Sequence, residues 1–414
     1  MLKRFTLVAF VVVVAAACGE SQASQPSSLL LGAIYPLSGP QAPGGKQELA
    51  GVEAALQLAE SRGAPKVRLQ VIDATTPAEA AAAVDTLVQK YHVPAILGTY
   101  GSTLSAAASA RAEALKTVYW ETGAVADPIT AQRQYVFRTV ATGSALGRMA
   151  VQFTHDVLIP GSNLTAPRAV VVRVKDIYGQ SVGGGEQQLA QTMGINVVDV
   201  IEYDPKAFDP DVIAARLAAD HADFLWDVSY IDDGIAIWQA ILKQHIALKG
   251  AIGTSSAFCM PEFSQRLGAE SVGVFAADKP NGDISAAALT ASGQALLTQA
   301  RSIYKQNTGE ALMEIPAVAG FVGGWTLFAD VLSNLAGTAT PNSIRAAALN
   351  VDVPVGDSIN GGGVKFGPAG ALDEGQNTRA AAVVGQWQAV GVMTVLYPAA
   401  FATGKVQTPP YGGM

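Results

Sequence analysis

Residues that could do chemistry are few in this chain, and the most suggestive pair precedes an alanine-rich helical run. Ser102 and Thr103 open that helical run (102–116), directly after an apolar strand-like run (94–101). The first turn of a helix carries unpaired N–H groups and a partial positive charge, which suit an anion such as a carboxylate. Open α/β sheets also bind ligands beyond the carboxyl ends of their strands. We therefore expect a small anionic ligand here, with simple helix capping by Ser102 as the alternative.

A second pattern, GQSVG at 179–183, fits the G-x-S-x-G elbow of serine hydrolases. Four residues (175–178) separate it from the preceding strand, whereas an elbow turns sharply, and no histidine follows His245. The glycines at 183–185 lack dinucleotide-loop spacing, and the sequence has no Walker loop, EF-hand loop or paired histidines. We expect no enzymatic activity, no cofactor and no metal.

The N-terminal residues are typical of an export signal. A short basic start precedes an apolar run (5–17) that is shorter than the roughly 20 residues needed to span a bilayer. Small residues followed by Cys18 resemble a bacterial lipobox, although Ala15 stands where leucine is commoner. We expect 1–17 to be a signal peptide and 18–28 a lipidated cysteine with a flexible polar tether. An ordinary cleaved signal peptide is the alternative.

Composition narrows the class of partner. The net charge of −7 becomes more negative once the basic leader is removed, which argues against nucleic acid and against binding to an anionic membrane surface. Only Cys259 would remain as a thiol, so no internal disulfide can form. Half of the residues are hydrophobic, enough for two lobes with full cores.

From residue 29 onward, apolar strand-like runs alternate with amphipathic helical runs. In the first part we expect strands at 29–37, 67–74, 94–101 and 117–124, separated by helices at 47–60, 77–91 and 102–116. After 135–142 the pattern restarts, with strands at 168–177, 195–204, 222–230, 249–256 and 272–280 and helices near 183–193, 209–219, 233–244 and 261–268. Residues 286–348 are largely helical, and short strands follow within 362–368 and 379–398. Continuous apolar strands between helices predict two α/β units with parallel sheets.

This succession resembles the type I periplasmic-binding fold, and specifically the branched-chain amino-acid-binding family of ABC importers. Seven segments in family order carry the resemblance: IYPLSGP (34–40), LGTYGSTLSAAASA (97–110), GAVADPIT (123–130), YVFRTVAT (135–142), VKDIYGQSVGGG (174–185), ADFLWDVSY (222–230) and FGPAG…VVGQWQAVGVMTVLYP (366–398). The resemblance implies two doubly wound α/β lobes, joined by a three-strand hinge, that close on a ligand between them.

The resemblance also implies a division of the chain. The crossings between lobes are expected near 139–142, 277–279 and 352–356. The first lobe would hold 29–140 plus 279–352, the second lobe 141–278 plus 353–400, and 401–414 would form a C-terminal tail.

In this family a serine at the position of Ser102 binds the ligand carboxylate, with Tyr100 and Thr103 beside it. The turn at Gly123, Ala124 and Val125 would add backbone N–H groups, although the family's threonine hydroxyl is missing at Val125. Tyr178 and Tyr230 match the aromatic residues that cover the ligand from the second lobe, and lobe-edge packing is their alternative role.

Ser255 departs from the family pattern, because amino-acid binders carry an acid there that pairs with the ligand's α-ammonium. A neutral serine cannot balance a buried cation, which is costly to leave unpaired. Either another acid (Glu121, Asp227 or Asp232) takes this role, or the ligand has no ammonium. Gly44, where an aromatic wall is common, would widen the pocket. Amino acids, amides, ureas and small carboxylates all stay open as ligands.

The resemblance implies a monomeric, exported lipoprotein that captures a small molecule and delivers it to an ABC permease. It would lie in the periplasm or at the cell surface, held there through Cys18. The alternative is a ligand-sensing domain that reports to a receptor or regulator, since one fold serves both roles. The tether, and the lack of a membrane-spanning helix, favour transport.

Overall fold

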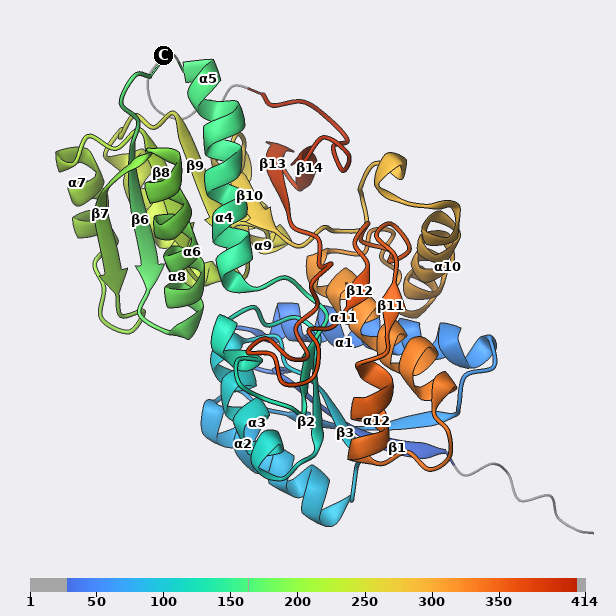
Figure 1. Ribbon diagram of the computed structural model, residues 1–414. Helices are drawn as coiled ribbons and strands as arrows, with labels where there is room; N and C mark the ends of the chain where they lie inside the picture. The colour runs from blue at the N-terminus through green and yellow to red at the C-terminus, as the bar shows by residue number, and fades with distance from the viewer. Residues whose placement is uncertain (1–27, 163, 408–414) are drawn as a thin grey trace, which may run out of the picture.

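The computed structural model describes residues 28–162 and 164–407. Two α/β lobes lie side by side, each with helices on both faces of its sheet (Figure 1). This architecture confirms the predicted fold class. The expected signal peptide and the lipidated Cys18 lie outside the described residues.

The first lobe is built on a five-stranded parallel sheet with the order β2-β1-β3-β4-β5. Its strands are β1 (Leu29–Tyr35), β2 (Val67–Asp73), β3 (Ala95–Gly98), β4 (Val118–Glu121) and β5 (Val136–Arg138). One face packs against α1 (Ala42–Ser61), α10 (Ala291–Thr308), α11 (Ile315–Trp325) and α12 (Pro341–Ala348). The other face packs against α2 (Pro77–Asp85) and α3 (Ser102–Ala114).

Alternation along the strands produces these two faces. In β4, Val118 and Trp120 join the core under α1 and α11, whereas Tyr119 points into the core under α2 and α3. Both faces are covered, so the inner strands β1 and β3 are apolar throughout, as predicted, whereas the edge strand β2 also carries Arg68 and Gln70.

The second lobe holds a seven-stranded sheet with the order β14-β13-β10-β9-β8-β6-β7. Its strands are β6 (Arg168–Val174), β7 (Asn196–Tyr203), β8 (Phe224–Val228), β9 (Gly250–Thr254), β10 (Phe275–Asp278), β13 (Val383–Ala389) and β14 (Val392–Tyr397). They run parallel except that β13 is antiparallel to both of its neighbours. The helices are α4 (Gly143–Phe153), α5 (Ile159–Ser162), α6 (Ile177–Met193), α7 (Pro210–Ala219), α8 (Ile231–Lys243) and α9 (Pro261–Leu267).

The third crossing between the lobes lies later than the sequence suggests. Strand β11 (Asp352–Val353) pairs with β12 (Val364–Lys365), and Phe366 then packs in the first lobe, its ring 5.4 Å from Trp120 and 5.1 Å from Phe137. Burial of Phe366 therefore holds this segment on the first lobe. The predicted crossing at 352–356 is wrong, and the chain reaches the second lobe between Asn377 and β13.

Hydrogen bonds join the first and third crossings. Asn377 donates from its side chain to the carbonyl of Thr139 at 2.8 Å, and Gln376 donates to that of Val140 at 2.9 Å. Arg138 donates through Nε to Gln376 Oε1 at 2.6 Å. Two of the three connections between the lobes therefore form one hydrogen-bonded unit.

Part of the expected C-terminal tail is also structured. The side chains of Gln386 and Gln388 on β13 donate to the carbonyls of Gln407 (2.8 Å) and Lys405 (2.6 Å). Residues 403–407 therefore lie along the second lobe, whereas Phe401 packs against the first-lobe core and accepts a hydrogen bond from the N–H of Ser285. The rest of the tail falls outside the described residues.

One helical segment of the described chain, Ile315–Asn334, is long and apolar enough to cross a membrane by length and composition. Most of it is buried inside the first lobe, where it begins with α11 and packs against α1. Packing in the core of the lobe accounts for its apolar composition.

Glu186 on α6 is a buried acid whose protonation should make the stability of the second lobe depend on pH. Its side chain is fully buried, and neither carboxyl oxygen has a hydrogen-bond partner among the described residues. Burial raises the pKa of Glu186 to about 8, and Arg173 opposes this only in part. The folded chain therefore holds this proton at pH values where the unfolded chain has lost it.

We expect stability to fall as the pH rises from about 5 to about 8, by at most about 1.4 kcal/mol per pH unit for this proton. Glu186→Gln and Glu186→Leu should both flatten that slope in urea titrations at several pH values. A slope unchanged in both variants would contradict the prediction.

Candidate functional site

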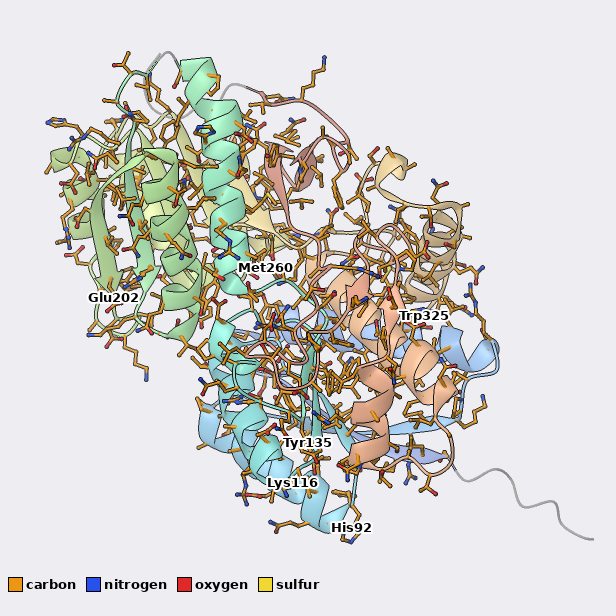
Figure 2. The ribbon with its side chains drawn as sticks, viewed as in Figure 1. His92, Lys116, Tyr135, Glu202, Met260 and Trp325 are labelled. Atoms are coloured by element: carbon orange, nitrogen blue, oxygen red, sulfur yellow. The ribbon has the colours of Figure 1, made fainter. Side chains whose placement is uncertain are left out.

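A cavity of about 430 Å³ lies between the lobes, a volume typical of small-molecule sites. Tyr100 from the first lobe and Tyr230 from the second line it, and so does Met260, which Figure 2 places where the lobes meet. The two tyrosines follow the carboxyl ends of β3 and β8, where open sheets bind ligands. The structure thus brings two of the predicted site residues to one cavity.

The cavity wall is largely apolar, with charged groups among its lining residues. The wall includes four prolines, three of them from the first lobe: Pro36, Pro40, Pro43 and Pro205. Among the acids, Asp232 forms an ion pair with Arg266 at 2.6 Å, and Asp233 accepts hydrogen bonds from the hydroxyl of Tyr203 and the N–H of Tyr230. Asp232 therefore already has a cationic partner.

Ser102 occupies the first turn of α3 but does not cap it. Gly101 is the N-cap residue, and Ser102 Oγ instead accepts a hydrogen bond from the N–H of Ala126 at 3.2 Å. The side chain is nearly buried, whereas that of Thr103 is partly exposed. Helix capping by Ser102 is therefore wrong, because its hydroxyl holds the loop that follows β4.

The turn after β4 is already occupied by a side chain of the protein. Glu121 Oε1 accepts hydrogen bonds from the N–H groups of Gly123 (2.7 Å) and Ala124 (2.6 Å), while Oε2 accepts from the N–H of Thr99. Burial raises the pKa of Glu121 to about 7, and these hydrogen bonds act against that rise. The donors expected to hold a ligand carboxylate are thus paired with Glu121, and Glu121 is not a free partner for an ammonium. Val125, the last residue of this turn, is buried in the second-lobe core.

On the second lobe, the two predicted tyrosines have different positions. Tyr178 is buried and donates its hydroxyl to the carbonyl of Ser255. Its ring centroid lies 5.5 Å from that of Tyr230, which donates to Asp176 Oδ2 at 2.6 Å. Asp176 also caps α6 through the N–H of Gly179. Tyr178 therefore supports the wall from behind, and Tyr230 lines the cavity.

Asp227 does not take part in the cavity. It is fully buried in β8 and accepts a hydrogen bond from the hydroxyl of Ser229. Burial, together with the nearby acids Asp233 and Glu186, raises its pKa. Asp227 therefore belongs to an acidic cluster inside the second lobe, and it is not the partner that Ser255 lacks.

Gly44 does not widen the cavity as the sequence suggests. A Cβ atom at Gly44 would lie 2.2 Å from Cζ of Tyr100, so the tyrosine ring already fills that space. The Tyr100 hydroxyl reaches across to the sulfur of Met260 at 3.4 Å. A contact between the two lobes therefore closes this side of the cavity.

Sequence reasoning missed a buried lysine at the hinge. Lys279 follows β10, and its Nζ atom lies 3.1 Å from Ser255 Oγ, 3.3 Å from the carbonyl oxygen of Gly123 and 3.1 Å from Asp278 Oδ1. Ser256, the neighbour of Ser255 in the chain, lines the cavity. The sequence could have pointed to Lys279, because a lysine at the end of an apolar strand and inside a predicted crossing is unusual. Only the fold brings it to Gly123 and Ser255.

Glu48 is a further buried acid, and it interacts electrostatically with Glu121 and Lys279. Burial and the neighbouring Glu121 raise the pKa of Glu48 well above its usual value, while Lys279 acts in the opposite direction. A Cβ atom at Gly123 would collide with the carboxyl group of Glu48, so glycine is required there for the close approach. The described residues contain no group of three or more histidine, cysteine or acidic side chains able to hold a metal.

Comparisons with known proteins agree with this architecture. The profile of the family described as "Periplasmic binding protein" matches residues 29–390. A curated relative, the Leu/Ile/Val-binding protein homolog 8 of Brucella abortus (strain 2308), is 28% identical over 383 residues, which cover 91% of this chain and 92% of the relative.

Solved structures show the same fold at lower sequence identity. The substrate-binding protein LivJ of a branched-chain amino acid transporter from Streptococcus pneumoniae, in complex with isoleucine, superposes with a TM-score of 0.72 at 17% identity, covering 90% of this chain and all of that one. A solute-binding protein of an ABC transporter from R. palustris, in complex with benzoate, superposes with a TM-score of 0.70 at 18% identity, covering 92% of this chain and 99% of that one.

Proposed function

Because this chain belongs to the periplasmic binding protein family, we propose that it captures a small amino-acid-like, carboxylate or amide ligand by lobe closure and delivers it to an ABC permease. The family consists of solute-binding proteins that work outside the cytoplasm. The cavity between two lobes joined by a narrow hinge is the observation that carries this function.

We further propose that the protein is a monomer tethered by lipid at Cys18. The apolar leader, the small residues before the cysteine and the polar stretch after it support this proposal. Such a tether would keep the lobes close to the membrane and within reach of a permease.

A thermal-shift panel of amino acids, amides and small aliphatic and aromatic carboxylates tests ligand capture. A ligand present at 100 times its Kd stabilises the folded state by about 2.7 kcal/mol, so its Tm shift is measurable. Tyr230→Ala should reduce that shift, since Tyr230 lines the cavity. Tyr91→Ala, in the first lobe and away from the cavity, should leave it unchanged. Silence across the whole panel would contradict the proposed function.

A sensor role remains the rival to transport. Pull-down with the permease components encoded beside this protein's gene separates the two, because a transport protein should bind them when its ligand is present. Stable capture of a signalling receptor, with no permease, would favour the sensor.

A further inference from the structure

Resting on the proposed solute-binding function, we propose that the ligand is a small carboxylic acid without an α-ammonium group, and that Lys279 binds its carboxylate. The resemblance leaves amino acids, amides and carboxylates open. The contacts of the buried Lys279 side chain favour a carboxylate among these ligands.

Lys279 lies at the point where both lobes meet the hinge. Its ammonium contacts the first lobe through the carbonyl of Gly123 and the second lobe through the hydroxyl of Ser255. Its side chain is only 6% exposed. The protein therefore places a cation of its own between the two lobes, in contact with Ser255, whose neighbour Ser256 lines the cavity.

That cation occupies the acceptors that a ligand ammonium would need. A ligand ammonium beside Ser255 would have to share the carbonyl of Gly123 and the hydroxyl of Ser255 with Lys279. The acids that could offset a second cation are engaged: Glu121 with the turn after β4, and Asp278 with Lys279 itself. Two like charges at such short range repel each other strongly in a buried site.

A carboxylate meets the opposite situation. Lysine has three N–H donors, and those of Lys279 face Asp278, Gly123 and Ser255. A ligand carboxylate would keep the pair with Asp278 and replace the two neutral acceptors by a charge-assisted hydrogen bond, which is stronger. The Ser255 hydroxyl can also donate to the same carboxylate. Glu48 adds little repulsion, because burial raises its pKa and favours its neutral form.

The cavity suits the rest of such a molecule. Tyr100, Tyr230 and Met260, together with the four prolines, offer apolar and aromatic surface to a flat or branched body. The contact between the Tyr100 hydroxyl and the Met260 sulfur is weak, because a thioether is a poor acceptor. Ser255 and Lys279 do not line the cavity as it stands. The proposal therefore requires the ligand to displace this weak contact and extend the cavity past Ser256.

Matched ligands test the proposal by isothermal titration calorimetry on the mature chain. The aliphatic set is leucine, 4-methylpentanoate (leucine without its ammonium) and 3-methylbutylamine. The aromatic set is phenylalanine, 3-phenylpropanoate and benzoate. We expect at least one ammonium-free acid to bind tenfold or more tighter than the matching amino acid, and the amine to give no signal.

Variants then assign the effect to one side chain. Lys279→Met should weaken the acid a hundredfold or more, whereas Lys175→Met, at an exposed lysine of the same lobe, should change its affinity less than threefold. The double variant Lys279→Met with Ser255→Glu exchanges the cation for an acid, and should then prefer the amino acid. Circular dichroism checks that each variant is folded.

The comparison of leucine with 4-methylpentanoate in the unmodified protein decides the matter even if Lys279→Met fails to fold. Tighter binding of amino acids than of the matching acids would overturn this inference and leave the proposed function standing. Silence from every acid, amino acid and amide would instead overturn the proposed function.

Discussion

Trp120→Ala should lower the free energy of unfolding by about 4–6 kcal/mol. The side chain is fully buried, with its ring 5.5 Å from Phe137 and 5.4 Å from Phe366. Truncation of a buried tryptophan costs about 3–5 kcal/mol through lost burial and the cavity left behind. The indole N–H also donates to the carbonyl of Gly323 on α11 at 2.8 Å, and an unpaired buried acceptor adds about 1–3 kcal/mol.

Urea titration followed by circular dichroism measures this loss. Trp325→Ala is the matched control, because Trp325 is only partly buried and its ring is covered on one side by Arg62, at 5.0 Å from the guanidinium carbon. We expect the control to lose about 1–2 kcal/mol, which covers partial burial and one cation–π contact. Equal losses in the two variants would show that the aromatic cluster of Trp120, Phe137 and Phe366 does not stabilise the first lobe in the way described.

Arg138→Met should cost about 3–5 kcal/mol of stability and weaken ligand binding. The guanidinium is fully buried and donates to Gln376 Oε1 and to the carbonyl of Ala126, both at 2.6 Å. Each hydrogen bond from a charged donor contributes about 1.5–3 kcal/mol. Burial lowers the pKa of Arg138 to about 10, so the group still carries its charge at neutral pH.

Ligand binding should suffer because Arg138 holds the segment that follows β4. The carbonyl of Ala126 belongs to the same loop as the turn at Gly123 and Ala124. Arg138→Lys keeps the charge but not the planar fork of donors, so it should recover only part of the lost stability. Urea titration and the thermal-shift panel measure the two effects. A stable Arg138→Met variant with normal ligand response would contradict this role of Arg138.

Most of the fold could be predicted from the sequence, because its strands are buried on both faces. Runs such as 29–37 are almost continuously apolar, and such runs alternate with amphipathic helical runs, a pattern that few architectures satisfy. The segment around Phe366 could not be assigned in this way. Its strands are only two residues long and β12 is flanked by glycines, and the partners of Phe366 are aromatic residues more than 200 positions earlier in the chain.

The candidate site was predictable in position and less so in chemistry. Tyr100 and Tyr230 each follow a strand at the carboxyl edge of its own sheet, where open sheets bind ligands, and the two edges face the same cavity. The pairing of Glu121 with backbone N–H groups depends on the exact course of a turn. Lys279 shows the limit best, since its three oxygen neighbours come from two lobes and the hinge. The type and spacing of charged residues in the sequence cannot reveal contacts between segments that only the fold brings together.

The bonds from Asn377 and Gln376 to the first crossing have a mechanical consequence. Three unconnected strands would let one lobe rotate relative to the other about several axes. Because the first and third crossings are hydrogen-bonded to each other, they should resist twisting of one lobe about the other and leave bending in one direction as the easiest movement. In the proposed lobe closure, each movement would then end in the same alignment, and less orientational entropy would be lost.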